Sequence, residues 1–126
     1  MAKQYEGMDF PAKAYDDMSS SQYRFVKMTS NDTVDVCSGT TDVVIGVLQS
    51  EGTTGQGVSV RHAGHTKVAL GDTVSAGALV GTTTEGKATT ITAGSSTTAY
   101  VAGICVVGGS DGEVGEIILS PRGRAA

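Results

Sequence analysis

The chain lacks the features by which several large classes of protein are recognised. Its 126 residues contain no apolar run approaching the ~20 residues that a transmembrane helix needs, and its first residues lack the apolar core of a signal peptide. Lysine and arginine number 9 against 13 acidic residues, giving a net charge of −4, whereas a nucleic-acid-binding protein normally shows a basic excess. The sequence therefore predicts no membrane span, no secretory route and no nucleic-acid partner.

Cysteine is scarce as well. The two cysteines, Cys37 and Cys105, lie 68 positions apart and do not form a CxxC pair. Because the chain shows no export signal, the ordinary expectation is two small, buried and reduced thiols. A disulfide between them has no support in the sequence.

Motifs of catalytic and metal chemistry are also missing. The sequence has no GxSxG motif, and its only histidines are His62 and His65. A metal site needs three or four ligands, and residues i and i+3 of a strand point to opposite faces unless the chain turns between them, here at Gly64. No glutamate or cysteine stands nearby in the sequence to complete a set. We therefore expect no catalytic residue, no cofactor and no metal, and predict that the chain is not an enzyme.

The abundant residues are those of β-structure. The chain has 18 glycines, 16 threonines and 15 valines but only 4 leucines. Valine and threonine pack well on a pleated surface, and glycine supplies the positive-φ positions of tight turns. A chain of this length holds one hydrophobic core. We predict a single all-β domain.

Short alternating or apolar runs, separated by turn residues, follow one another from residue 22 onward. They recur about every ten residues and amount to about eight or nine strands, which is typical of a small β-barrel or β-sandwich. The expected strands cover residues 23–27, 33–37, 43–49, 58–62, 66–70, a part of 71–80, 88–92, 100–107 and 114–119. Residues 93–98 are expected to form a polar loop, and residues 121–126 a short basic C-terminal tail.

Two glycines mark places where these strands depart from regularity. The longest apolar run, residues 43–49, predicts a strand buried on both faces, with Gly46 at a bulge or a close approach of two backbones. Ala63 and Gly64 separate two alternating runs, and a turn or a bulge is expected there.

The large side chains are concentrated at one end of the chain. Five of the six aromatic residues lie within the first 25 positions and all four methionines within the first 28, so that only Tyr100 lies beyond. Residues 1–20 show neither a helical nor a strand period. Pro11 fixes its own φ and biases Phe10 towards an extended conformation. These residues predict an extended N-terminal arm, separate from a β-domain formed by residues 21–120.

Two interpretations of the arm are open. It can pack back on its own barrel, or it can dock on a neighbouring chain, and we favour docking because exposed aromatics on a free arm need a partner surface to cover them. Twenty extended residues reach roughly 66–72 Å, beyond the edge of so small a domain. The candidate partner-binding residues are Tyr5, Met8, Phe10, Pro11, Tyr15 and Met18.

The order of the strands and turns resembles that of a known family. Over roughly residues 21–120, the chain is similar to the small head decoration, or capsid cement, proteins of tailed bacteriophages. Each element by itself is ordinary β-strand and turn sequence, so the resemblance depends on the order in which they occur. The segments that carry it are residues 23–27, 43–49, 57–68, 76–80, 85–88, 101–104 and 111–119.

The resemblance implies both a fold and a function. It implies a β-tulip-like barrel that binds the outer surface of an icosahedral phage head, with the major capsid protein as partner and homotrimers at three-fold and quasi-three-fold positions. Assembled in the host bacterial cytoplasm, such a virion protein stabilises the expanded capsid against the pressure of the internal DNA. The alternative is another β-module of the virion, such as a fibre base, a tail component or a carbohydrate-binding component. Sugar sites stack on exposed aromatics, and after residue 25 the sequence offers only Tyr100.

Overall fold

The computed structural model of the chain describes residues 7–92 and 99–124, whose backbone forms strands and no helix. The all-β prediction is confirmed, and no helix among these residues is long and apolar enough to cross a membrane. The strands are β1 (Gly7–Ala14), β2 (Phe25–Ser30), β3 (Thr33–Val36), β4 (Gly46–Leu48), β5 (Gly57–Ala69), β6 (Leu79–Thr82), β7 (Ala88–Ile91), β8 (Tyr100–Val107) and β9 (Val114–Arg124).

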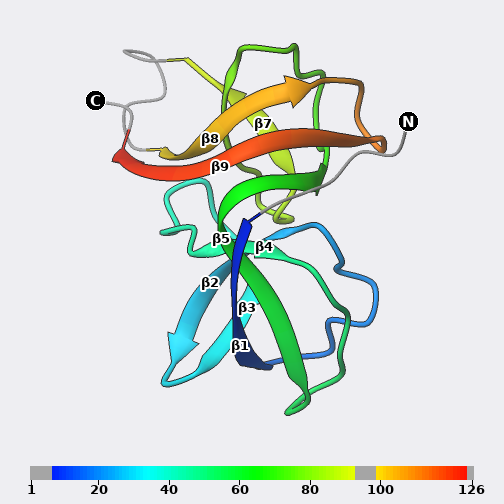
Figure 1. Cartoon of the computed structure of the whole chain (residues 1–126), viewed down its shortest axis with the longest axis vertical. Helices are drawn as coiled ribbons and strands as arrows, with labels where there is room; N and C mark the ends of the chain where they lie inside the picture. The colour runs from blue at the N-terminus through cyan, green and yellow to red at the C-terminus, as the bar shows by residue number, and fades with distance from the viewer. Residues whose placement is uncertain (1–6, 93–98, 125–126) are drawn as a thin grey trace.

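The strands form one sheet that curls on itself twice. Their order is β1-β3-β2-β4-β5-β9-β8-β6-β7, and an additional pairing of β1 with β5 closes the first five strands into a barrel. At the other end, a parallel bridge between Leu70 and Ala88 brings the end of β5 to β7. Figure 1 shows β5 running through both parts. We call β1–β4 with the first part of β5 the N-terminal barrel, and the rest of β5 with β6–β9 the C-terminal half.

The two alternating runs on either side of Gly64 form one strand of 13 residues and are not separated by a turn. Gly64 has a φ of 106°, a conformation that glycine adopts readily, and it pairs with Gly7 on one edge and with Leu119 on the other. Both edges of β5 are paired here, so the strand continues through Gly64. The expected bulge is present one residue earlier, because the register of β1 against β5 shifts between Met8, which pairs with Ala63, and Asp9, which pairs with Arg61. We call this irregular part of β5 the bend.

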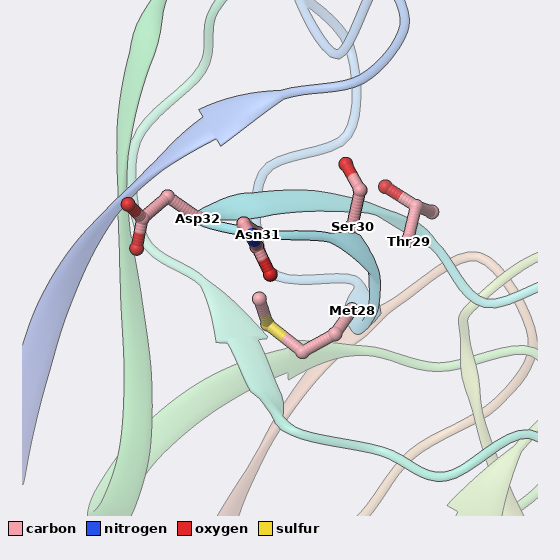
Figure 2. Close-up of a pocket in the computed structure, with 5 residues that line it drawn as sticks. All are labelled: Met28, Thr29, Ser30, Asn31 and Asp32. Atoms are coloured by element: carbon pink, nitrogen blue, oxygen red, sulfur yellow. The ribbon is translucent and has the colours of Figure 1, made fainter.

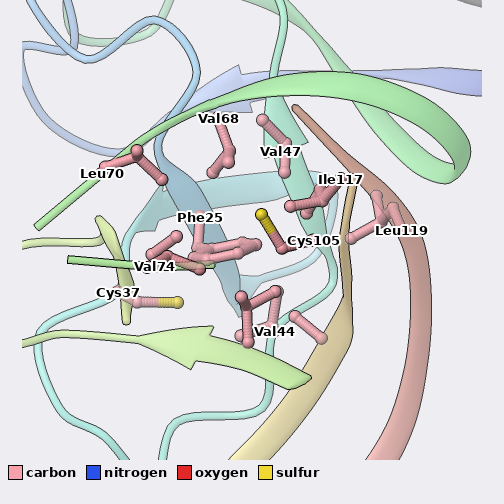
Figure 3. Packing of buried hydrophobic residues seen from close by; sticks show 13 residues of the cluster. Phe25, Cys37, Val44, Val47, Val68, Leu70, Val74, Cys105, Ile117 and Leu119 are labelled. Atoms are coloured by element: carbon pink, nitrogen blue, oxygen red, sulfur yellow. The ribbon is translucent and has the colours of Figure 1, made fainter. Parts of the chain in front are cut away.

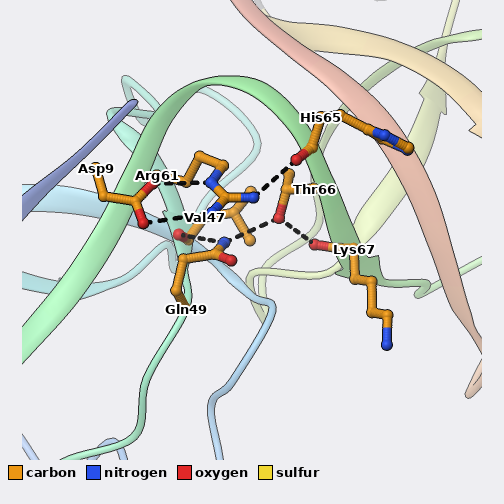
Figure 4. Close-up of polar contacts among 7 residues, drawn as sticks. All are labelled: Asp9, Val47, Gln49, Arg61, His65, Thr66 and Lys67. Carbon is orange, nitrogen blue, oxygen red and sulfur yellow. Dashed lines mark hydrogen bonds and ion pairs between the residues drawn. The ribbon is translucent and has the colours of Figure 1, made fainter. Parts of the chain in front are cut away.

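A polar cluster holds this bend (Figure 4). The Nε of Arg61 donates to Oδ1 of Asp9 in β1 at 2.8 Å, and its Nη1 donates to the carbonyl oxygen of His65 at 2.8 Å. On the neighbouring strand edge, the amide of Gln49 donates to Oγ1 of Thr66 at 2.8 Å. The guanidinium thus joins β1 to both sides of the bend.

The buried side chains gather in two main clusters. One lies inside the N-terminal barrel, and a larger one lies between the barrel and the C-terminal half, with Phe25 in the middle of the side chains labelled in Figure 3. The barrel cluster contains Ala12, Ala14, Met18, Val26, Val34, Leu48, Val58 and Val60. The larger cluster contains Phe25, Cys37, Val44, Val47, Val68, Leu70, Val74, Val80, Ala88, Ala102, Cys105, Ile117 and Leu119.

The prediction of a strand over residues 43–49 is only partly right. The strand β4 is limited to Gly46–Leu48, where Gly46 and Val47 pair with β2 and Val47 and Leu48 pair with β5. Val44 is buried, but Val43 is exposed, so the apolar run is not buried throughout. The close approach expected at Gly46 is confirmed: a Cβ there would collide with the backbone carbonyl of Arg61.

The expected basic tail is, in part, a continuation of β9. The strand runs to Arg124, which pairs with Tyr100, and Gly123 pairs with Val101. The first residues of β8 present a strand edge to which this backbone can bond. A register shift accompanies Pro121, which has no N–H to donate. Residues 125–126 and the expected loop at 93–98 lie outside the described residues.

Both cysteines are free and buried. Burial raises the pKa of the Cys37 thiol to about 12, and burial also raises the pKa of Cys105. Since the thiolate is the reactive form, we predict that neither residue reacts with a thiol reagent at pH 8 until the protein is unfolded. Titration with Ellman's reagent, with and without guanidinium chloride, measures this. Rapid reaction of two thiols in the native protein, or none after unfolding, would contradict this prediction.

The same two residues contribute to the packing of the core. Each Cys→Ala replacement should therefore lower the free energy of unfolding by at most about 3 kcal/mol.

Candidate partner-binding surface

The structure places most of the expected N-terminal arm inside the domain. Residues 7–14 form β1, which pairs antiparallel with β5 from Gly7–Gly64 to Lys13–Gly57. At its end, β1 also pairs in parallel with β3. The chain therefore follows the first of the two interpretations, an arm packed on its own barrel, and residues 7–20 are not separable from residues 21–120.

Burial of small and flexible side chains explains this arrangement. Ala12, Ala14 and Met18 fill the core of the N-terminal barrel, and Met18 is 0% exposed. The backbone after β1 is also bonded to the domain, since the amide of Tyr15 donates to Val34 at 2.9 Å and that of Met18 to Gly52 at 2.8 Å. Docking within the chain requires no loss of translational freedom, which association with a second molecule does.

The candidate residues do not share one environment. Tyr5 lies outside the described residues, and the buried Met18 cannot reach a partner. Met8 and Tyr15 are 64% and 59% exposed. They lie near opposite ends of β1, whose length at ~3.3 Å per residue is more than about 20 Å. The expected anchors therefore do not form a continuous surface.

Phe10 and Pro11 occupy the middle of β1. Phe10 is half-buried, and its ring centroid lies 5.8 Å from that of His62. Pro11 is exposed and lines a hollow of about 280 Å³ with Ala12, Lys13 and Asp32. A partner can contact this hollow only through a proline ring and a few polar groups.

A larger hollow of about 650 Å³ surrounds the turn between β2 and β3. It is lined by Met28, Thr29, Ser30, Asn31 and Asp32, and in Figure 2 the carboxylate of Asp32 points away from the hydroxyl groups of Thr29 and Ser30. Ligand sites generally bring a few polar groups together over an apolar floor. This hollow does not, because its polar groups diverge.

The histidines belong to separate contacts. His62 packs against Phe10, whereas Nε2 of His65 lies 2.9 Å from Oε1 of Glu116 in β9. Over residues 7–92 and 99–124, no three histidine, cysteine or acidic side chains come close enough to hold a metal ion. In this part of the chain, His62 and His65 therefore belong to two separate side-chain contacts.

Exposed aliphatic side chains concentrate on the hairpin of β8 and β9. Of the eight large apolar side chains that are exposed in the described residues, four lie there: Val106, Val107, Val114 and Ile118. Sequence reasoning missed this surface. The available signal was the unbroken apolar run at residues 117–119, because a half-buried strand normally carries a polar residue at its outward position.

Comparison with known proteins identifies a structural likeness. No family model matches the chain, and no curated protein matches its sequence. The crystal structure of the head fibre gp8.5 N base of bacteriophage phi29 is similar to it, with a TM-score of 0.68 and 18% sequence identity. The likeness covers 96% of this chain and 99% of that chain. At this identity the comparison shows that the two chains share a fold.

Proposed function

We propose that this chain is a structural protein of a phage virion that binds the outer surface of an icosahedral head. The observation that carries the proposal is the likeness to a phage head-fibre base over nearly the full length of both chains. The order of strands and turns in the sequence supports it independently, because it resembles the capsid cement proteins of tailed phages. The acidic net charge of −4 suits the outside of a shell better than the side that faces DNA.

In its specific form, the proposal makes the chain a decoration protein. Homotrimers bind the major capsid protein at three-fold and quasi-three-fold positions and stabilise the expanded shell against internal DNA pressure. This role is mechanical and assigns no catalytic activity to the chain. It requires a rigid domain, and the closed barrel and the shared strand β5 provide one.

The second candidate function is that of a fibre base, and the structural likeness favours it directly. A fibre base also attaches to the outside of a head. The two functions differ in their effect on the shell. A decoration protein strengthens contacts between capsid subunits, whereas a fibre base needs only to stay attached to the shell.

Binding to isolated heads tests the proposal. We predict that the purified chain, added to undecorated expanded heads, appears in cryo-electron microscopy as density at three-fold positions. It should also raise the temperature at which the heads release their DNA, because each bound copy adds contacts between neighbouring subunits.

Heads already saturated with unlabelled protein serve as the control and should take up no labelled protein. Binding without any gain in heat resistance would favour the fibre base over the decoration protein. If the chain does not bind to heads at all, both forms of the proposal are wrong.

A further inference from the structure

A row of aliphatic side chains crosses the outward face of the C-terminal half. Ile118 of β9 lies opposite Ile104 of β8, Ile104 lies opposite Leu79 of β6, and Leu79 pairs in turn with Ile91 of β7. Directly opposed residues of neighbouring strands lie about 4.5–5.5 Å apart at Cβ, close enough for their side chains to touch. Four strands thus contribute to a single row of branched aliphatic side chains.

The row is covered at one end and open at the other. Ile91 is 6% exposed and belongs to a small buried cluster with Ala99 and Val101, against which Leu79 packs. At the opposite end, Ile118 is 44% exposed. The described part of the chain therefore covers the β7 end of the row and leaves the β9 end uncovered.

A bulge in β8 adds apolar side chains at the open end. The register of β8 against β9 shifts between Cys105 and Val107, and Val106 and Val107 are both exposed. In a regular strand, one of two consecutive residues would point into the core, and bulges re-aim side chains in this way. We call the outward aliphatic side chains of the hairpin the β8–β9 face: Ile104, Val106, Val107, Val114 and Ile118.

The charged side chains along this face are mostly acidic. The turn between β8 and β9, residues 108–113, carries Asp111 and Glu113 and no basic residue. Within the face, Oε1 of Glu116 lies 2.9 Å from Nε2 of His65, and Glu116 is paired across the strands with Lys67 of β5. Among the side chains described here, three carboxylates therefore stand against one lysine.

This combination of groups determines which kind of partner fits. Aliphatic side chains gain by burial alone, so the partner must offer an apolar patch of its own. The carboxylates favour lysine or arginine at the edge of that patch and oppose further acidic groups. A second copy of this chain, docked through the same face, would bring the same acidic turn into the contact, and its net charge is −4.

We propose that the β8–β9 face is the surface through which this chain binds the head, and that the shell meets it with an aliphatic patch bordered by lysine or arginine side chains. The inference rests on the proposed function and names the surface that performs it. Binding to a shell requires an exposed contact surface, and half of the large apolar side chains exposed in the described residues lie on this hairpin.

Two matched pairs of charge substitutions test the inference. Val114 and Val43 are 54% and 55% exposed, but Val43 lies between β3 and β4, outside the hairpin. Each valine is replaced by aspartate and by lysine, and co-sedimentation measures how the labelled full chain binds to undecorated expanded heads. Both Val114 variants lose the aliphatic contact and should bind about tenfold more weakly than the natural chain, or worse. Val114→Lys should bind at least about threefold more weakly than Val114→Asp, because lysine meets like charges on the shell.

The Val43 pair measures what an added charge does away from the face. At 0.15 M salt, charges separated by more than a Debye length of about 8 Å are largely screened, so both Val43 variants should bind within about twofold of the natural chain. Circular dichroism checks that each variant is folded. If a charged Val114 variant is unfolded, Val114→Thr and Asp111→Lys replace the pair, and each should weaken binding by at least about threefold.

The possible failures of the two proposals are distinguishable. Equal binding of the natural chain and the folded Val114 variants would overturn this inference and leave the proposed function intact, as would equal weakening by the Val43 pair. Tighter binding of Val114→Lys than of Val114→Asp would also overturn it, because the partner would then be acidic. Sedimentation equilibrium without heads tests a second copy as the occupant: self-association that Val114→Asp abolishes would overturn the inference. If the natural chain does not bind heads at all, the proposed function and this inference are both wrong.

Discussion

Removal of residues 1–20 should leave the protein unable to fold cooperatively. The deletion takes away β1, which closes the N-terminal barrel through seven pairings with β5, and with it three side chains of the barrel core. The exposed edge of β5 and the emptied core together should lower the free energy of unfolding by more than about 5 kcal/mol. This loss is comparable to the whole stability of a typical domain. Thermal unfolding followed by circular dichroism, with the dispersion of amide resonances in NMR, measures the loss.

Two methionine replacements give this experiment a matched control. Met18→Ala empties a site in the barrel core, where Met18 is 0% exposed, and should cost about 2–5 kcal/mol. Met8→Ala changes the same residue type in the same segment, but at 64% exposure, and should change stability by less than about 0.5 kcal/mol. The prediction would be wrong if the truncated protein melted at the temperature of the full chain and Met18→Ala did not lower stability. Residues 7–20 would then be an arm that docks on another surface.

Replacement of Phe25 by alanine should be the most damaging single substitution in the larger core cluster. Phe25 is the largest fully buried side chain of the described residues. Its backbone is also held, since its amide donates to Gly86 at 2.7 Å and its carbonyl accepts from Cys37 at 3.0 Å. The chain cannot easily move inward to fill the space, so Phe25→Ala should lose about 3–5 kcal/mol of unfolding free energy.

Urea denaturation measures this loss, and Phe25→Leu is the control. Leucine retains most of the apolar volume and should lose no more than about 1.5 kcal/mol. Equal losses for the two variants would show that the aromatic ring itself, and not the filled volume, is what the core requires. A loss below about 1 kcal/mol for Phe25→Ala would contradict the packing around this residue.

The sequence by itself determined several of the strands after residue 22, although it did not predict β1. The runs predicted at residues 33–37, 88–92 and 100–107 match β3, β7 and β8 to within one residue at either end. Alternation of apolar and polar residues indicates which side of a strand faces the core. This pattern is local, so it is recognised without knowledge of the partner strand. The same holds for Gly46, whose position within an apolar run predicted the close approach that the structure contains.

The tertiary structure decided how the strands end and where the apolar surfaces lie. The continuity of β5 through Gly64 depends on partners on both of its edges, and the extension of β9 to Arg124 depends on the start of β8. The candidate site was least predictable for the same reason. The place of Met18 in a core and of Ile118 on a surface was determined by pairings between residues far apart in the chain. Large side chains near the N-terminus indicate that apolar groups need to be covered, but only the closed barrel determines that the chain itself covers Met18 and leaves Met8 and Tyr15 exposed.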